Sequence, residues 1–318
     1  MSSSIDLNAF IDHPINDKTF ESTIPPIALR EDCIAGIDEA GRGPVLGPMV
    51  YSLAFFPLSE ESLLKKLDFA DSKTLTEEKR EEIFSKIGEN EYKKIGFLAT
   101  VLSPVTISNS MFKRSKYNLN QLSHDTAIAL ITRAQQNGVK IKKVFLDTVG
   151  PADKYEAKLK HLFPDLTIKV SNKADSLFPI VSAASVCAKV IRDRVVNDWK
   201  FIEPNLHFSK EDYGSGYPSD PKTKSFLSKN LDPIFGYTTF VRFSWSTIKN
   251  ILDDKAIDCQ WEESEDEEPV VESKPTKKIS NYFKAVNSEE KPQKTRLNAF
   301  LKERNLEPIT SPQDFCHF

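Results

Sequence analysis

The chain has 318 residues and a formal net charge of −3 at pH 7, a length that allows one large domain with an appendage. Residues 254–318 carry 14 acidic and 10 basic side chains, a balance of −4 that leaves +1 for residues 1–253. This near neutrality argues against binding of nucleic acid by bulk charge, so a nuclease would have to rely on a local groove and metal ions. No run approaches 18 apolar residues and no basic stretch precedes an apolar core near residue 1, so neither a membrane span nor a secretion signal is predicted.

The first half of the chain is expected to open with an arm and continue as strands. Residues 1–30 are polar, contain Pro14, Pro25 and Pro26 and show no period, which predicts a flexible N-terminal arm. Residues 34–38 and 49–56 read as strands of an antiparallel hairpin, since turn-forming residues lie between them. The next elements are a charged helix over 76–87 and a third strand over 94–102.

The second half alternates between helical and strand patterns. Helical periods over 126–137, 155–162 and 180–199 are separated by short apolar runs that predict strands. Those strands are expected at residues 143–147 and 166–170. This order predicts an α/β fold with a mixed sheet flanked by helices.

Two further parts follow the α/β pattern. Residues of about 200–253 are expected to form a C-terminal helical part of the domain that starts at residue 31, with a helix over 221–229. Residues 254–318 contain an acidic run at 262–268 and too few apolar side chains to offset ordering entropy, so a disordered tail is predicted. The four cysteines show no CxxC spacing, which favours a reducing, intracellular compartment.

Four acidic residues stand at or near the ends of predicted strands, namely Asp38, Glu39, Asp147 and Asp175. Burial of an unpaired carboxylate at such a place is costly, so a bound cation is the favoured explanation. Carboxylate oxygens favour Mg²⁺ or Mn²⁺, and two such cations can activate water for phosphodiester hydrolysis. For each acid taken alone, a structural acid or turn former remains the alternative.

The adjacent acids Asp38 and Glu39 constrain the local backbone. Successive side chains of a strand point to opposite faces, so both can face one pair of cations only if the strand ends or bulges there. The glycines at 41, 43 and 47 also suggest a dinucleotide-binding turn. That reading is excluded because Pro44 and a second strand follow, where such a turn must open a helix.

Six motifs in a fixed order resemble those of the type 2 ribonuclease H (ribonuclease HII) family, in particular its eukaryotic catalytic subunits. The resemblance covers residues 32–252 and implies a ribonuclease H-like fold. The motifs are Gly36-Ile37-Asp38-Glu39-Ala40-Gly41-Arg42-Gly43-Pro44, Asp71-Ser72-Lys73, Leu146-Asp147-Thr148-Val149-Gly150, Lys173-Ala174-Asp175, Ala183-Ala184-Ser185-Val186-Cys187-Ala188-Lys189 and Gly214-Ser215-Gly216-Tyr217-Pro218-Ser219-Asp220.

The resemblance implies a reaction and a set of catalytic residues. Asp38, Glu39, Asp147 and Asp175 would be the catalytic acids that bind two divalent cations. The expected reaction is hydrolysis of the phosphodiester on the 5′ side of a ribonucleotide, in RNA–DNA hybrids or at single ribonucleotides in duplex DNA. It leaves a 3′-hydroxyl and a 5′-phosphate, and serves ribonucleotide excision and RNA primer removal.

Other residues are expected to bind the substrate. The backbone of Gly41, Arg42 and Gly43 can approach a ribose closely enough to bind its 2′-hydroxyl. By resemblance, Tyr217 would stack on the sugar that follows the ribonucleotide, the alternative being an ordinary exposed aromatic. Lys73 and Lys189 match basic positions that could contact phosphates, although solvated lysines would look the same.

Partners and location also follow from the resemblance. It implies a nuclear heterotrimer with two non-catalytic subunits. The tail segment from Thr276 to Phe283 approximates a sliding-clamp-binding peptide, with threonine in place of the usual glutamine. The remaining alternative is a non-catalytic nucleic-acid-binding scaffold with the same fold.

Overall fold

The structure, a computed structural model, describes residues 5–67, 69, 75–115 and 117–257. These residues belong to two compact units, one containing residues up to 231 together with 237–250, the other containing 232–236 and 251–257. Within the second unit, Asp232 and Gly236 exchange two backbone hydrogen bonds, and the amide of Ile257 donates to Pro233 O at 2.8 Å. No helix of the described residues is long and apolar enough to cross a membrane.

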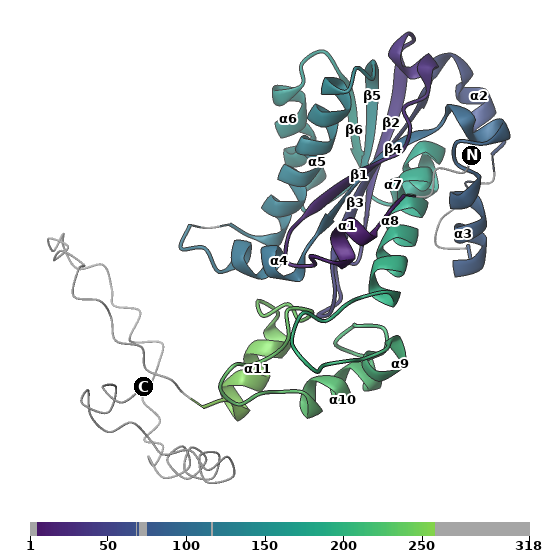
Figure 1. Cartoon of the computed structure of the whole chain (residues 1–318). Coiled ribbons are helices and arrows are strands. Elements are labelled where there is room, and N and C mark those ends of the chain that lie inside the picture. Colours follow the sequence, from purple (N-terminus) through teal and green to yellow (C-terminus); the bar gives the residue numbers. More distant parts are fainter. Residues whose placement is uncertain (1–4, 68, 70–74, 116, 258–318) are drawn as a thin grey trace, which may run out of the picture. The chain divides into compact units, whose positions relative to one another are not determined.

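A six-stranded mixed sheet forms the centre of the first unit (Figure 1). Its strand order is β1-β4-β3-β2-β5-β6, in which β2, β5 and β6 run parallel and the other pairs are antiparallel. The predicted hairpin is thus confirmed as β2 and β3. The strands are β1 Lys18–Glu21, β2 Cys33–Ala40, β3 Met49–Pro57, β4 Gly96–Leu102, β5 Ile141–Asp147 and β6 Thr167–Ser171.

The described part of the N-terminal segment, residues 5–30, contradicts the expectation of a flexible arm over residues 1–30. Residues 18–21 form the edge strand β1, and Phe10 is fully buried with its ring 6.1 Å from that of Trp199. The segment is ordered because Asp17 accepts the amide of Ser103 and the Ser103 hydroxyl donates to Ile15 O at 2.9 Å. Such contacts, distant in sequence, leave no local period that a sequence pattern could reveal.

Helices cover both faces of the sheet (Figure 1). The side chains of α5 and α6 share a buried cluster with one face, while α7 and α8 pack on the other face and α3 packs on α8. The helices are α1 Asn8–Ile11, η1 Pro26–Leu29, η2 Leu58–Glu60, α2 Glu61–Leu64, α3 Glu77–Lys86, η3 Asn90–Lys94, α4 Pro104–Met111, α5 Leu119–Gln136, α6 Ala152–Leu162, α7 Ala174–Leu177, α8 Pro179–Asn197, α9 Lys210–Tyr213, α10 Pro221–Lys229 and α11 Ser246–Lys255.

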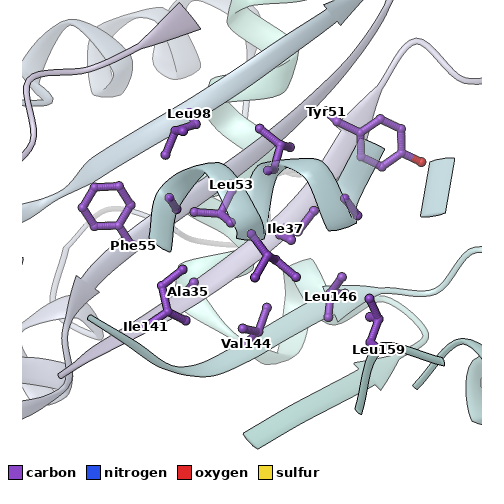
Figure 2. Close-up of a cluster of buried hydrophobic side chains, with 14 of the residues drawn as sticks. Ala35, Ile37, Tyr51, Leu53, Phe55, Leu98, Ile141, Val144, Leu146 and Leu159 are labelled. Atoms are coloured by element: carbon purple, nitrogen blue, oxygen red, sulfur yellow. The ribbon is translucent and has the colours of Figure 1, made fainter. Parts of the chain in front are cut away.

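The main core lies between the sheet and α5. Figure 2 shows Ile37, Leu53, Val144 and Leu146 in this cluster, contributed by three neighbouring strands. All are at most 2% exposed, so their burial supplies much of the apolar stabilisation of the sheet. The alternation of β2 therefore directs its odd-numbered residues toward α5 and its even-numbered residues toward α8.

Gly36 sets the distance between β2 and α8. A Cβ atom at this position would lie 2.5 Å from backbone atoms of Ile180 and Val181. Only a residue without a side chain permits this approach, which brings the first turns of α8 against β2, two residues before Asp38.

The predicted C-terminal helical part contains α9, α10 and α11. Most of the predicted tail, including the segment from Thr276 to Phe283, lies outside the described residues. Helix α4 was not predicted, although Ser103 caps it by accepting the amide of Thr106 at 2.9 Å and Pro104 follows at its first position.

Candidate active site

Asp38 lies near the end of β2 on the face covered by α8. Its cross-strand neighbour is Ser52, and the hydroxyl of Ser185 in α8 donates to its carboxylate. Only 7% of Asp38 is exposed, and one carboxylate oxygen accepts the amide of Glu39 at 2.8 Å. The chain thus holds this acid in a nearly dry environment with few donors.

Asp147 and Asp175 join Asp38 on the same face. The last parallel pair of β2 and β5 is Ile37 with Leu146, so Asp38 and Asp147 follow it on neighbouring strands. Asp147 Oδ1 accepts the amide of Thr148 at 2.9 Å and that of Ala174 at 3.3 Å, which ties β5 to the start of α7. Asp175 is the next residue and is only 3% exposed.

The aspartates make an environment that favours positive charge. The pKa of Asp38 is raised to about 6, mainly by burial and in smaller part by the charges of Asp147 and Asp175. This crowding of hard oxygen donors fits divalent cations in chemical type. Among the described residues, no three His, Cys, Asp or Glu side chains are already grouped as the ligands of one ion.

Glu39 lies on the opposite face of β2, beside Tyr51 on β3. The expectation that the strand ends or bulges at these two acids is wrong, because β2 pairs regularly with β3 as far as Ala40. The regular pleat therefore separates Asp38 from Glu39. Burial, followed by the charge of Asp38, raises the pKa of Glu39 to about 8, whereas Arg42 lowers it.

The turn from Gly41 to Gly43 follows directly after β2. Gly41 has φ +77°, and a Cβ atom there would lie 2.8 Å from Pro48 O, so both the conformation and the space require glycine. The guanidinium of Arg42 donates to Asn120 and Ser123 of α5, which directs this side chain to the α5 face. The backbone of Gly41 and Gly43 is thus left uncovered by any side chain of the turn itself.

Tyr217 lies against this turn. A Cβ atom at Gly43 would be 3.0 Å from Tyr217 Cε1, while 48% of the tyrosine remains exposed. The amide of Val45 donates to Gly216 O at 2.8 Å, so the loop that carries Tyr217 is bonded to the segment after the turn. The structure therefore places Gly43 and Tyr217, which come from two separate sequence motifs, side by side.

A hollow of about 370 Å³ joins several predicted substrate-binding residues, and we call it the active-site hollow. Asp38, Asp147 and Asp175 do not line it, and Lys73 lies outside the described residues. Arg80, Arg192 and Asp193 line it although they were not predicted; the three-residue spacing of Lys189 and Arg192 on α8 was the available signal. Its lining is Glu39, Ala40, Gly41, Arg42, Gly43, Arg80, Lys189, Arg192, Asp193 and Tyr217.

Arg242 is a further unpredicted residue beside the turn. It is fully buried, and burial is the largest cause that lowers its pKa to about 9, followed by the charge of Arg192. Its guanidinium lies 4.8 Å from the centre of the Trp245 ring. A single arginine in an aromatic-rich segment carries no periodic signal, so sequence patterns could not identify it.

The sheet order and the acidic cluster at the ends of β2 and β5 define a ribonuclease H-like nuclease. The chain belongs to the ribonuclease HII family, whose model matches residues 35–248. The predicted family and fold are thereby confirmed, and the protein is a ribonuclease of the hydrolase class.

Similar proteins come from several branches of life. The chain is 50% identical over 291 residues to the ribonuclease H2 A-subunit of Bos taurus and 47% identical over 290 residues to that of Homo sapiens. Each alignment covers 91% of this chain and 94% of the relative.

Two solved archaeal structures share the fold. The ribonuclease H2 of Pyrococcus horikoshii OT3 matches with a TM-score of 0.57 at 29% identity, covering 70% of this chain and 98% of that chain. A chain from the PCNA:RNase HII complex of Archaeoglobus fulgidus gives a TM-score of 0.53 at 29% identity, covering 67% and 95%.

Proposed function

We propose that this ribonuclease cleaves duplexes on the 5′ side of a ribonucleotide and leaves a 3′-hydroxyl and a 5′-phosphate. Its substrates would be RNA–DNA hybrids and duplex DNA that contains single ribonucleotides, as in ribonucleotide excision and primer removal. The observation that carries this proposal is the position of buried acids beside a glycine turn and an exposed tyrosine, on the fold of the ribonuclease HII family.

Asp38, Asp147 and Asp175 would hold two divalent cations, Mg²⁺ or Mn²⁺. Glu39, proposed as the fourth acid, lies on the opposite face of β2 and would join them only if the backbone near the end of β2 turned its carboxylate toward the other three. The like charges that raise the pKa of Asp38 support this assignment, because a cation would relieve their repulsion. When bound, such a pair activates a water molecule and neutralises the leaving oxyanion of an in-line displacement. The chain's own contribution is to exclude bulk water from Asp38 and to fix Asp147 through two backbone amides.

The turn at residues 41–43 would recognise the ribose. Its glycines expose backbone groups that can hydrogen-bond a 2′-hydroxyl, the group that separates RNA from DNA. Tyr217, beside Gly43, would stack on the sugar that follows and so report an RNA-to-DNA junction. Recognition of the ribose and of its neighbour would thus share one surface.

Basic side chains would position the duplex without reading its sequence. Lys189, Arg80 and Arg192 line the active-site hollow, where their charges favour phosphate groups. Lys73 is proposed for the same role on the basis of its motif. Together they would offset the acids and permit approach of a polyanion to a nearly neutral protein.

Incision of matched duplexes tests the proposed function. Wild-type protein with Mg²⁺ should cut a DNA duplex that contains one ribonucleotide and should leave the all-DNA duplex intact. Asp147→Asn should lose at least about a hundredfold in rate because a catalytic carboxylate is removed, while Asp165→Asn, at an exposed position, should behave as wild type. Full activity of Asp147→Asn would refute the assignment of the acids.

We also propose that the protein works in the nucleus with two non-catalytic subunits. The similarity to proteins named as one subunit of ribonuclease H2 supports an assembly of several different chains. The segment from Thr276 to Phe283 is proposed to bind the sliding clamp, and the clamp complex of the archaeal relative supports the idea. Calorimetry with a peptide of this segment tests it, and a peptide with Tyr282→Ala and Phe283→Ala that binds equally well would contradict it.

A further inference from the structure

Arg242 carries a buried charge that no carboxylate neutralises among the described residues. Its partners are backbone carbonyls: Nε donates to Gly47 O at 2.8 Å, one terminal nitrogen to Gly41 O at 2.6 Å and the other to Arg42 O at 3.2 Å. A guanidinium in a dry environment is costly unless its charge and donors are compensated, and here three carbonyl dipoles accept three of its five N–H groups. The arginine therefore fixes the orientation of two successive peptide groups of the turn.

The third carbonyl of the turn is held by the same segment. Trp245 Nε1 donates to Gly43 O at 3.2 Å, while the tryptophan ring covers the guanidinium of Arg242. Three consecutive carbonyls, those of Gly41, Arg42 and Gly43, are thus directed toward the segment at residues 242–245.

The opposite ends of these peptide groups point the other way. In a trans peptide the C=O and N–H bonds are antiparallel, and the described residues contain no cis peptide bond. Fixing the carbonyls of Gly41 and Arg42 therefore directs the amides of Arg42 and Gly43 away from Arg242. The third peptide ends at Pro44, which has no N–H, so the turn presents two donors and no third.

We infer that Arg242 is a positioning and specificity-determining residue that aims the Arg42 and Gly43 amides at the 2′-hydroxyl of the ribonucleotide. This inference rests on the proposed role of the turn in reading the ribose. Arg242 contacts no substrate itself and acts through the backbone alone. Lysine cannot replace it, because one ammonium group lacks the planar fork that reaches separate carbonyls.

The test compares binding of two duplexes by the full-length chain. Fluorescence anisotropy in EDTA, which prevents incision, gives the affinity for a DNA duplex with one ribonucleotide and for the matched all-DNA duplex. The ratio of the two affinities should fall about tenfold in Arg242→Lys, since two amide hydrogen bonds are lost. Affinity for the all-DNA duplex should stay within about twofold of wild type, since phosphate contacts are unchanged.

Two further variants separate positioning from general stability. Tyr213→Phe loses a buried hydroxyl that donates to Val196 O at 2.7 Å and does not touch the turn, so it should lower the melting temperature and keep the wild-type ratio. Trp245→Phe retains a ring over Arg242 and loses only the bond to Gly43 O, whose peptide group has no N–H, so its ratio should stay near that of wild type.

The outcomes are distinguishable. A folded Arg242→Lys protein with the wild-type ratio would overturn the inference and leave the proposed function standing. If the wild-type protein instead bound the ribonucleotide-containing duplex and the all-DNA duplex with equal affinity, the ribose-reading role of the turn would be overturned, and the inference with it. If Arg242→Lys does not fold, Arg242→Gln takes its place, because a planar amide keeps two donors but cannot reach all three carbonyls. A wild-type ratio in a folded Arg242→Gln protein would overturn the inference.

Discussion

Asp38 combines deep burial with nearby negative charge, and this combination makes stability depend on pH. The pKa of its folded state, about 6, lies above the ordinary value of 3.8, so the folded protein binds this proton more tightly than the unfolded chain does. The stability that protonated Asp38 contributes is complete below about pH 4 and is lost as the pH rises through about 6.

Asp38→Asn should remove this dependence. The difference of about two pKa units corresponds to roughly 2–3 kcal/mol, so the variant should be more stable than wild type at pH 7 by about that amount, while losing incision. Urea unfolding at pH 4 and pH 7 measures the effect, with Asp165→Asn as the exposed control. Equal pH dependence in Asp38→Asn and wild type would contradict the electrostatic explanation.

Tyr217 is the residue whose change should separate two substrates. Tyr217→Ala should reduce incision at a single ribonucleotide in DNA about tenfold more than incision of a long RNA–DNA hybrid, because only the former presents an RNA-to-DNA junction at the cut. Tyr217→Phe should keep most of the activity, since the ring against Gly43 remains. Equal losses of Tyr217→Ala on both substrates would rule out a junction-sensing role.

At the scale of elements, the approach of α8 to β2 depends on Gly36. Gly36→Ala should destabilise the protein by about 1–3 kcal/mol, because its Cβ would collide with helix backbone that no rotamer change can move. Activity should fall with it, since a displaced α8 withdraws Ser185 from Asp38. Thermal unfolding and incision rates measure both effects.

A matched substitution controls for the change in β2. Thr167→Ala, at an exposed position of β6, should change stability by less than about 0.5 kcal/mol and keep wild-type activity. A Gly36→Ala protein as stable as Thr167→Ala would show that α8 can shift without cost.

Strands and helices with a strong local pattern were predictable, and those formed by distant contacts were not. The long apolar stripe of α8 and the apolar runs of β2 and β3 gave their positions within a few residues. Strand β1, with the sequence Lys-Thr-Phe-Glu, alternates too briefly and is ordered through contacts about 80 residues away. The four acids could be proposed from the sequence because each follows such a run. The opposite faces of Asp38 and Glu39 could not be predicted, because that depends on β2 continuing regularly to Ala40.

For the whole molecule, the near neutrality of the region up to residue 253 limits contact with phosphates. If Lys189, Arg80 and Arg192 provide the main contacts, the logarithm of affinity for an all-DNA duplex should fall with the logarithm of salt concentration with a slope of about −3. Anisotropy titrations between about 50 and 200 mM salt measure the slope. A slope near −8 would indicate a far larger basic surface than the described residues provide.

The hydrogen bond from Val45 to Gly216 has a consequence for how the protein inspects a duplex. Since Gly43 and Tyr217 belong to loops joined at this point, neither can move far without the other, and their relative position is fixed. If the turn reads the ribose and Tyr217 contacts the next sugar, as proposed, two consecutive nucleotides would have to fit this fixed arrangement together. Selection would then depend on the spacing of neighbouring sugars as well as on the chemistry of either one.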